Sequence, residues 1–195
     1  MSPPVRVRQM LSDEFDIMRG VSVAAFGDDP DIGYLLDALH DSWAWEDGLS
    51  FVAECDGDLV GHVLYTHAIL DAPRQLQDVL VLSPIGVRRD LQMQGIGGEL
   101  ITYSLNAIGR RNEPLVFLEG HPAYYPRFGF RRAADLGFVA PSVRIPPDAF
   151  MVYPLPRYDE WMTGALIYPD AFWRCDAVGL RQQASAAGDS GAAIE

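Results

Sequence analysis

Three closely spaced glycines follow a polar, arginine-containing segment near the middle of the chain. The segment "RRDLQMQGIGGELITYSL" (88–105) places Gly95, Gly97 and Gly98 directly before an amphipathic run. Glycines leave no side chain between the backbone and a ligand, and the first N–H groups of a helix have no intrahelical partner. Together with the positive end of the helix dipole, such groups can bind a phosphate. A purely structural strand-to-helix turn is the alternative interpretation.

The glycine spacing and the residue content exclude several chemical classes. A dinucleotide-binding G-x-G-x-x-G sequence needs glycine at position 100, where this chain has Leu100. All 15 lysine or arginine residues are arginine, which excludes a Walker A loop and any lysine Schiff base. Cys55 and Cys175 belong to no C-x-x-C pair, and no H-E-x-x-H occurs. We therefore expect free thiols and no metal site.

Charge is distributed unevenly along the chain. The net charge is −12, yet residues 88–132 contain seven arginines and four acidic residues, a balance of +3, so the other 150 residues carry −15. An acidic protein is a poor general binder of nucleic acid. A basic central third instead favours a small polyanionic ligand bound locally.

The pattern of apolar residues predicts one mixed α/β unit of the α+β class. Residues 78–87, the helix after the glycines and residues 114–120 form a βαβ unit with parallel strands, whereas the preceding strands form an antiparallel hairpin. Pro84 cannot donate to a ladder, so we expect a bulge or an unpaired segment there. The other expected elements are strands at 5–10, 49–57, 58–70 and 149–156 and helices near 12–27 and 31–42.

Length and terminal composition suggest one domain at residues 1–181, followed by a disordered tail at 182–195. No apolar run approaches the ~20 residues of a membrane helix, and the N-terminus resembles no secretory signal. We expect a cytoplasmic protein without nucleic-acid or membrane partners. A homodimer is left open.

Two segments resemble the GNAT superfamily of N-acetyltransferases, in particular its bacterial branch with a Tyr-Tyr-x-Arg-Phe-Gly-Phe segment. "SPIGVRRDLQMQGIGGEL" is similar to the acetyl-CoA-binding segment, whose Gln/Arg-x-x-Gly-x-Gly/Ala signature is matched by Gln92, Gly95 and Gly97. "GHPAYYPRFGFRRA" is similar to the aromatic-Tyr-x-x-x-Gly-Phe segment, with Tyr125 four residues before Gly129. The resemblance covers most of residues 5–156. It implies a mostly antiparallel twisted sheet with a splayed parallel pair.

The resemblance also implies acetyl-CoA as the acyl donor and a primary amine of a small molecule or peptide as the acceptor. The pantetheine would pair with the backbone of Ile85 and Val87, and nearby arginines would meet the 3′-phosphate. The pyrophosphate would bind in the segment containing Gln92, Met93, Gln94, Gly95, Ile96, Gly97 and Gly98. No metal is implied.

By the same resemblance, the amine attacks the thioester directly. The Val87 amide polarises the carbonyl and Tyr125 protonates the leaving sulfur, while Tyr124 is expected to pack in the core. The strand ending at Val87 has no carboxylate after Asp78, so the general base is less defined. Glu119 is favoured. The alternatives are Glu54, His62, His67 and His121, or no protein base at all, with an amine of low pKa or a water relay.

Two other functions are left open by the sequence. A CoA-binding or regulatory module without catalysis would explain the missing strand carboxylate. A sugar-nucleotide or other phosphoanion binder would use the same glycine turn. The aromatic stretch 161–173 is expected to pack hydrophobically rather than to cap an acceptor pocket, and the acidic surface favours a cationic acceptor.

Overall fold

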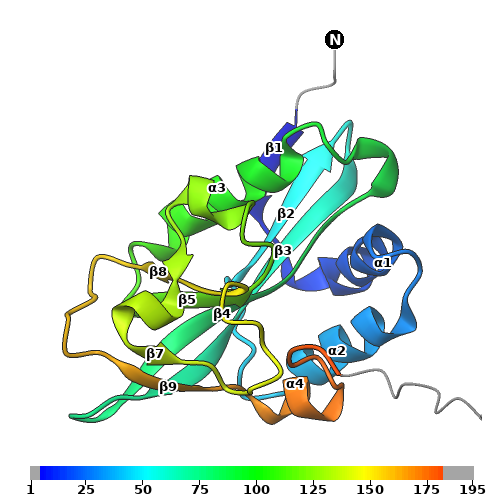
Figure 1. Cartoon of the computed structure of the whole chain (residues 1–195). Coiled ribbons are helices and arrows are strands. Elements are labelled where there is room, and N and C mark those ends of the chain that lie inside the picture. The colour runs from blue at the N-terminus through cyan, green and yellow to red at the C-terminus, as the bar shows by residue number, and fades with distance from the viewer. Residues whose placement is uncertain (1–4, 182–195) are drawn as a thin grey trace, which may run out of the picture.

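The computed structural model describes residues 5–181, which form a nine-stranded sheet with helices on both faces (Figure 1). The α-helices are α1 (Phe15–Ala25), α2 (Pro30–His40), α3 (Ile96–Ile108) and α4 (Asp170–Arg174), and short 3-10 helices include η2 (Arg89–Leu91) and η3 (Tyr125–Phe128). The strands are β1 (Val5–Gln9), β2 (Ser50–Cys55), β3 (Asp58–Asp71), β4 (Leu76–Val87), β5 (Leu115–Glu119), β6 (Arg131–Arg132), β7 (Phe138–Val139), β8 (Phe150–Pro154) and β9 (Gly164–Ile167).

The sheet is mostly antiparallel, with the order β1-β2-β3-β4-β5-β8-β6. Strands β4 and β5 are parallel, as the βαβ pattern predicts, and β2 and β3 form the expected antiparallel hairpin. The short strands β7 and β9 form a second parallel pair at the far end of β3. The mixed α/β class and the splayed parallel pair expected from the sequence are confirmed.

Strands β4 and β5 pair over only a short distance. The ladder consists of Leu80 opposite Val116 and Val81 opposite Phe117, although both strands continue beyond these residues. On the other edge of β4, two residues, Ser83 and Pro84, face the single residue Leu64 of β3. This is the bulge predicted at Pro84, which has no N–H to donate. The carboxyl ends of β4 and β5 are thereby left unpaired with each other.

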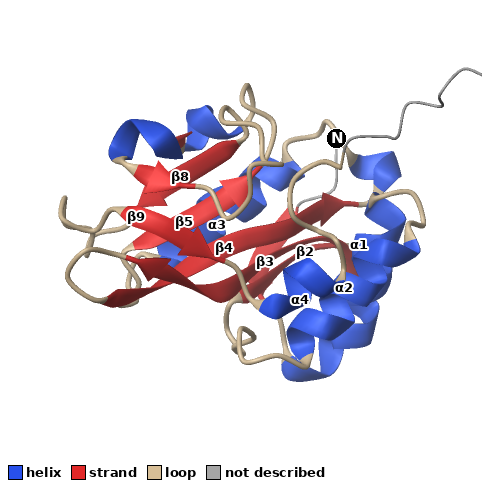
Figure 2. Cartoon of the chain, turned by 60° about the horizontal axis from the view of Figure 1, so that its bottom comes forward, coloured by secondary structure: helices blue, strands red, loops and turns tan. Residues whose placement is uncertain are grey.

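The helices divide between the two faces of the sheet. Helices α1, α2 and α4 lie together on one face and α3 lies on the other (Figure 2). Successive residues of a strand point to opposite faces, so Phe117 of β5 packs with the α1–α2–α4 core while Val116 and Leu118 pack with α3. The amphipathic run after the glycines folds as α3, and its apolar residues Ile101, Leu105 and Ile108 are buried.

The C-terminal part contains short elements that the sequence did not predict, among them β9 and α4. Both are short, and β9 begins at Gly164, whose φ of +126° is unusual for a strand residue. The expected hydrophobic packing of this stretch is confirmed, since Tyr168 and Phe172 are buried in the α1–α2–α4 core. The tail expected at 182–195 lies outside the described residues.

Two further expectations concern the whole described chain. Cys55 and Cys175 are free thiols, the first buried and the second half-buried. Within residues 5–181, no helix combines the length and the apolar character required to cross a bilayer.

Candidate active site

A cleft of about 680 Å³ lies beside the open end of the sheet. Its walls are the end of β4, the end of α1, η3 and the glycine turn, by which we mean residues 92–98. The side chains and backbone around it come from Ala25, Phe26, Ile85, Gly86, Val87, Leu91, Gln92, Met93, Gly95, Ile96, Gly97, Gly98, Tyr124, Arg127 and Phe128. Most of the expected cofactor residues therefore share one cavity.

Within residues 5–181, the glycine turn presents the backbone N–H groups of residues 93–98 without protein partners. Gly95 precedes α3 with φ of +91°, a conformation that favours glycine, and the Met93 side chain is fully exposed. The helical ladder starts only with the Glu99 N–H, which donates to the Gly95 carbonyl (3.1 Å). Within residues 5–181, no N–H group of residues 93–98 donates to another protein group. These groups are thus free for an anionic ligand.

The side chain of Gln92 fixes the turn in place. Its Nε2 donates to the Val87 carbonyl oxygen (2.9 Å), so the turn is tied to the end of β4. The Gln94 side chain makes a longer contact with the Asp90 carbonyl (3.4 Å). Gln92 therefore serves the site by positioning the backbone.

The last residues of β4 direct polar backbone groups into the open edge. The Arg88 N–H donates to the Val60 carbonyl (2.8 Å), and Val87 lies opposite Gly61. In an antiparallel pair, successive residues point their backbone groups alternately toward the partner strand and away from it. The N–H groups of Ile85 and Val87 therefore point away from β3, toward the side that β5 leaves unpaired.

The two neighbouring tyrosines of η3 occupy different environments. Tyr125 is buried against the α3 core, and a Cβ at Gly120 would overlap its ring. Burial and the neighbouring Tyr124 raise the pKa of Tyr125 to about 12, so its hydroxyl keeps its proton at neutral pH. Tyr124 lines the cleft, and a Cβ at Gly97 would lie 3.0 Å from its hydroxyl oxygen. Tyr124 is also half-buried and packs against the α3 core, so the expectation that it packs in the core is confirmed in part, and the same side chain additionally lines the cleft.

Glu119 lies at the end of β5 on the opposite face from Tyr125. The carboxylate is half-buried and accepts a hydrogen bond from the Gly179 N–H (3.0 Å). Burial raises the pKa of Glu119, and the Tyr168 hydroxyl, the Gly179 N–H and the Arg144 charge oppose that rise. With Tyr125 as an acid on the α3 face and Glu119 as a base on the opposite face, the two side chains could act on the two sides of a group held between β4 and β5.

The other base candidates are engaged in different parts of the fold. Glu54 pairs with Arg8 (3.0 Å), and His67 contacts Glu46 (2.7 Å). His121 is exposed and accepts the Ala123 N–H (3.2 Å). His62 is fully buried and bonded at both ring nitrogens, to Ser22 (3.1 Å) and Ser50 (2.8 Å). None of these four lines the cleft, and neither do Glu119 and Tyr125.

The buried His62 predicts a loss of stability in acid. Burial lowers its pKa to about 3, whereas an unfolded histidine titrates near ~6.5. As pH falls, the histidine of the unfolded chain therefore binds a proton before the folded one does. The contribution of His62 to the free energy of unfolding is complete above pH ~6.5 and is lost progressively toward pH ~3. The loss is at most ~1.4 kcal/mol per pH unit. His62→Gln should flatten this dependence in urea unfolding at pH 7, 5.5 and 4. His121→Gln should leave it unchanged, and parallel wild-type and His62→Gln curves would contradict the assignment.

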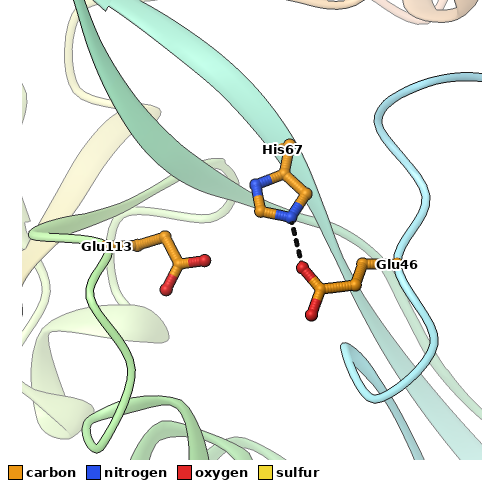
Figure 3. Close-up of side chains that lie close together, drawn as sticks. All are labelled: Glu46, His67 and Glu113. Atoms are coloured by element: carbon orange, nitrogen blue, oxygen red, sulfur yellow. Dashed lines mark hydrogen bonds and ion pairs between the residues drawn. The ribbon is translucent and has the colours of Figure 1, made fainter.

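A second group of ionisable side chains lies between β3 and the loops before β2 and β5. Glu46, His67 and Glu113 approach one another, with their ligand-type atoms within 4.8 Å (Figure 3). The geometry has the donor types of a metal site. However, Arg111 already pairs with Glu46 (2.8 Å) and with the buried Glu113 (2.8 Å). Its guanidinium supplies the positive charge that these carboxylates need, and it lowers the pKa of both.

Removal of Arg111 should destabilise the fold. Arg111→Met leaves the buried Glu113 and the partly buried Glu46 without their cation, and we expect a loss of about 1–3 kcal/mol in the free energy of unfolding. Arg110→Met is the matched control, because Arg110 is exposed one residue earlier. Chemical denaturation measures both. Equal stability of the two variants would show that the cluster contributes little.

Several residues of the cleft carry no signal in the sequence. Ala25 and Phe26 come from the end of α1, about 60 residues before the end of β4, and they meet the cleft because α1 packs over Gly86. Arg127 stacks on the Tyr124 ring (4.0 Å) and is the arginine of the central basic segment that lines the cleft. The "YYPRFGF" spacing could have indicated Arg127 and Phe128, since both belong to the same short helix.

A mixed sheet that opens between two parallel strands, with a glycine turn and a helix N-terminus beside the opening, defines the GNAT class of acetyltransferases. The model of the acetyltransferase (GNAT) domain family matches residues 6–133. An uncharacterised N-acetyltransferase of Escherichia coli K12, YjhQ, is 33% identical over 158 residues, which are 80% of either chain. The chain therefore belongs to the GNAT acetyltransferase family, as the two sequence segments predict.

Solved structures support the same fold. The GNAT family N-acetyltransferase YhbS of Escherichia coli, solved with CoA, aligns with a TM-score of 0.76 and 22% identity over 89% of this chain and 94% of its own. A GNAT family acetyltransferase of Brucella melitensis, solved with acetyl-CoA, aligns with a TM-score of 0.68 and 26% identity over 87% and 98%.

Proposed function

We propose that the protein transfers the acetyl group of acetyl-CoA to a primary amine. One observation carries the proposal: Met93 and residues 95–98, whose N–H groups have no protein partner within residues 5–181, line the same cleft as the end of β4. A diphosphate bound at the glycine turn and a pantetheine paired with the edge of β4 would be adjacent parts of one CoA molecule. The relatives solved with CoA and acetyl-CoA support this assignment.

The donor would extend from the glycine turn to the end of β5. Its pyrophosphate would accept hydrogen bonds from the turn, with Arg127 and the dipole of α3 adding positive potential. The pantetheine amides would pair with Ile85 and Val87 as an added strand. A shallower groove of about 550 Å³ along α3, lined by Tyr103 and Asn106 among others, shares Gly95 and Gly98 with the cleft and offers space for the adenosine end.

The chemistry would use the two faces of the end of β5. The amine nitrogen attacks the thioester carbon, the C–N bond forms and the C–S bond breaks, and the Val87 N–H stabilises the developing oxyanion. Glu119, on the face of α1 and α4, takes the proton from the amine. Tyr125, on the face of α3, gives its proton to the thiolate. The products are the acetylated amine and CoA.

Calorimetry with acetyl-CoA tests the donor site, and a free-thiol assay tests turnover. We expect acetyl-CoA and desulfo-CoA to bind, and UDP-sugars to leave bound desulfo-CoA in place. Absence of binding at millimolar acetyl-CoA would exclude the proposal. Displacement by a UDP-sugar would favour the phosphoanion-binding alternative.

A panel of polyamines, aminoglycosides, amino acids and peptides addresses the acceptor. The net charge of −12 favours cationic amines by long-range attraction. A CoA-binding module without catalysis is the second candidate, because β4 has no carboxylate after Asp78. It would bind the donor and release no thiol with any acceptor. The cytoplasmic location, the homodimer and the domain limit at residue 181 stay predictions.

A further inference from the structure

His62 is a buried histidine that connects three elements of the fold. It belongs to β3, and both of its ring nitrogens make hydrogen bonds. Nδ1 bonds to the Ser22 hydroxyl of α1 (3.1 Å), and Nε2 bonds to the Ser50 hydroxyl of β2 (2.8 Å). A neutral imidazole has one donor and one acceptor nitrogen, so the two serines satisfy it completely. These two hydrogen bonds, which we call the His62 bridge, attach α1 to the sheet at Ser22.

The His62 bridge contacts α1 at the end that borders the cleft. Ser22 is itself fully buried and lies in the last turn of α1, where its carbonyl accepts the Phe26 N–H (3.3 Å). Ala25 and Phe26, which follow within one turn, both line the cleft. A displacement of Ser22 would therefore move two residues of the cleft.

The same end of α1 packs directly on Gly86 of β4. Gly86 lies opposite His62 in the β3–β4 ladder. A Cβ at Gly86 would lie 2.8 Å from the Ala25 Cβ and 3.3 Å from the Phe26 ring. The residues on either side of Gly86 pack with the α3 core, whereas Gly86 faces α1. The Phe26 ring is thus placed beside the part of β4 whose N–H groups we assign to the pantetheine.

We propose that His62 and Ser22 are positioning residues for Phe26, and that the Phe26 ring packs against the pantetheine of acetyl-CoA. This inference rests on the proposed function. Phe26 is 43% exposed, so its ring keeps apolar area for a ligand. A pantetheine paired with β4 would pass this ring, and its methyl and methylene groups would be removed from water there. Without the His62 bridge, the end of α1 would be less ordered before binding, and ordering it would lower the affinity.

Ser22→Ala in the full chain tests the bridge, because it removes the hydroxyl and introduces a good helix former. We expect the Kd for acetyl-CoA, measured by calorimetry, to rise about threefold to tenfold, while kcat at saturating donor stays within roughly twofold. His62→Leu, which removes both hydrogen bonds, should raise the Kd at least as much. Ser104→Ala is the matched control, since Ser104 is a fully buried helical serine bonded to the Tyr65 hydroxyl (2.7 Å) on the α3 face. It should leave the Kd unchanged. A wild-type Kd in both Ser22→Ala and His62→Leu would overturn the inference.

A double-mutant cycle shows whether the His62 bridge acts through the Phe26 ring. Phe26→Ala should itself raise the Kd about tenfold, whereas Tyr34→Ala, which removes an exposed ring of α2 outside the cleft, should not. In the Phe26→Ala background, Ser22→Ala should have little further effect on the Kd. Additive effects would overturn the inference, because Ser22 would then influence binding by a route other than the ring.

Amide hydrogen exchange separates this inference from the proposed function, because it requires no ligand. The N–H groups of Phe26 and Gly27 donate to carbonyl groups of α1, and they should exchange faster in Ser22→Ala than in Ser104→Ala. If exchange is faster but the wild type binds no acetyl-CoA, the positioning role is supported, and the proposed function fails together with the pantetheine contact. Equal exchange in the two variants would overturn the positioning role.

Discussion

Gly97→Asp is expected to weaken the binding of acetyl-CoA about 5- to 100-fold. A side chain at residue 97 points into the cleft between the Tyr124 hydroxyl and Val87. An aspartate there would place its negative charge beside the site proposed for the pyrophosphate, and two such charges about 5 Å apart repel by ~1–3 kcal/mol. Calorimetry with acetyl-CoA measures the effect.

The same change should leave the fold intact. Residue 97 lies in the first turn of α3, where an acidic side chain is favourable for the helix dipole. Gly97→Asn separates size from charge, because it is nearly isosteric and neutral. Gly20→Asp controls for a helical Gly-to-Asp change, since Gly20 is exposed in α1 with no atom within 4 Å of its Cβ position. Wild-type affinity in Gly97→Asp would show that the diphosphate binds elsewhere.

Tyr125→Phe is expected to lower kcat about 100-fold or more while the affinity for acetyl-CoA stays within roughly threefold. The buried ring fixes the hydroxyl on the α3 side of the end of β5, and phenylalanine preserves that packing. The variant loses the proton that we assign to the leaving thiolate. Single-turnover thiol release and calorimetry separate the two effects.

Tyr124→Phe is the matched control, because it removes the hydroxyl of the neighbouring tyrosine. That hydroxyl lies beside Gly97 in the cleft and has no assigned role in proton transfer. This variant should retain turnover. Since the pKa of Tyr125 is raised to about 12, its ionisation should cause no loss of activity below pH ~11. Unchanged turnover in Tyr125→Phe would remove the tyrosine from the acid role, whereas a loss of donor affinity alone would assign it to binding.

The local parts of the site were predictable because each depends on neighbouring residues. The glycine turn follows from Gly95, Gly97 and Gly98 before an amphipathic run, and the break in β4 follows from the missing N–H of Pro84. The parallel arrangement of β4 and β5 follows from the helix between them. In each case a few consecutive residues determine the backbone.

The sequence did not determine which of two neighbouring tyrosines reaches the cleft, because that depends on the residues packed against each ring. Tyr124 and Tyr125 are adjacent and chemically identical, so no local pattern distinguishes the one that lines the cleft from the one that is buried. Their environments differ because Gly97 approaches one hydroxyl and Gly120 the other ring. The short β9 and α4 were missed for a related reason, since four or five residues carry too little periodicity to indicate an element.

The sequence by itself determined the order of the main elements and the glycine turn, because glycine, proline and apolar periodicity act over a few residues. The resemblance of two short segments indicated the family. Tertiary structure alone decided which side chains surround the cleft and what environment surrounds each candidate catalytic group. Glu119 shows the reason: its pKa depends on burial and on Tyr168, Arg144 and Gly179, which only the folded chain brings to the end of β5.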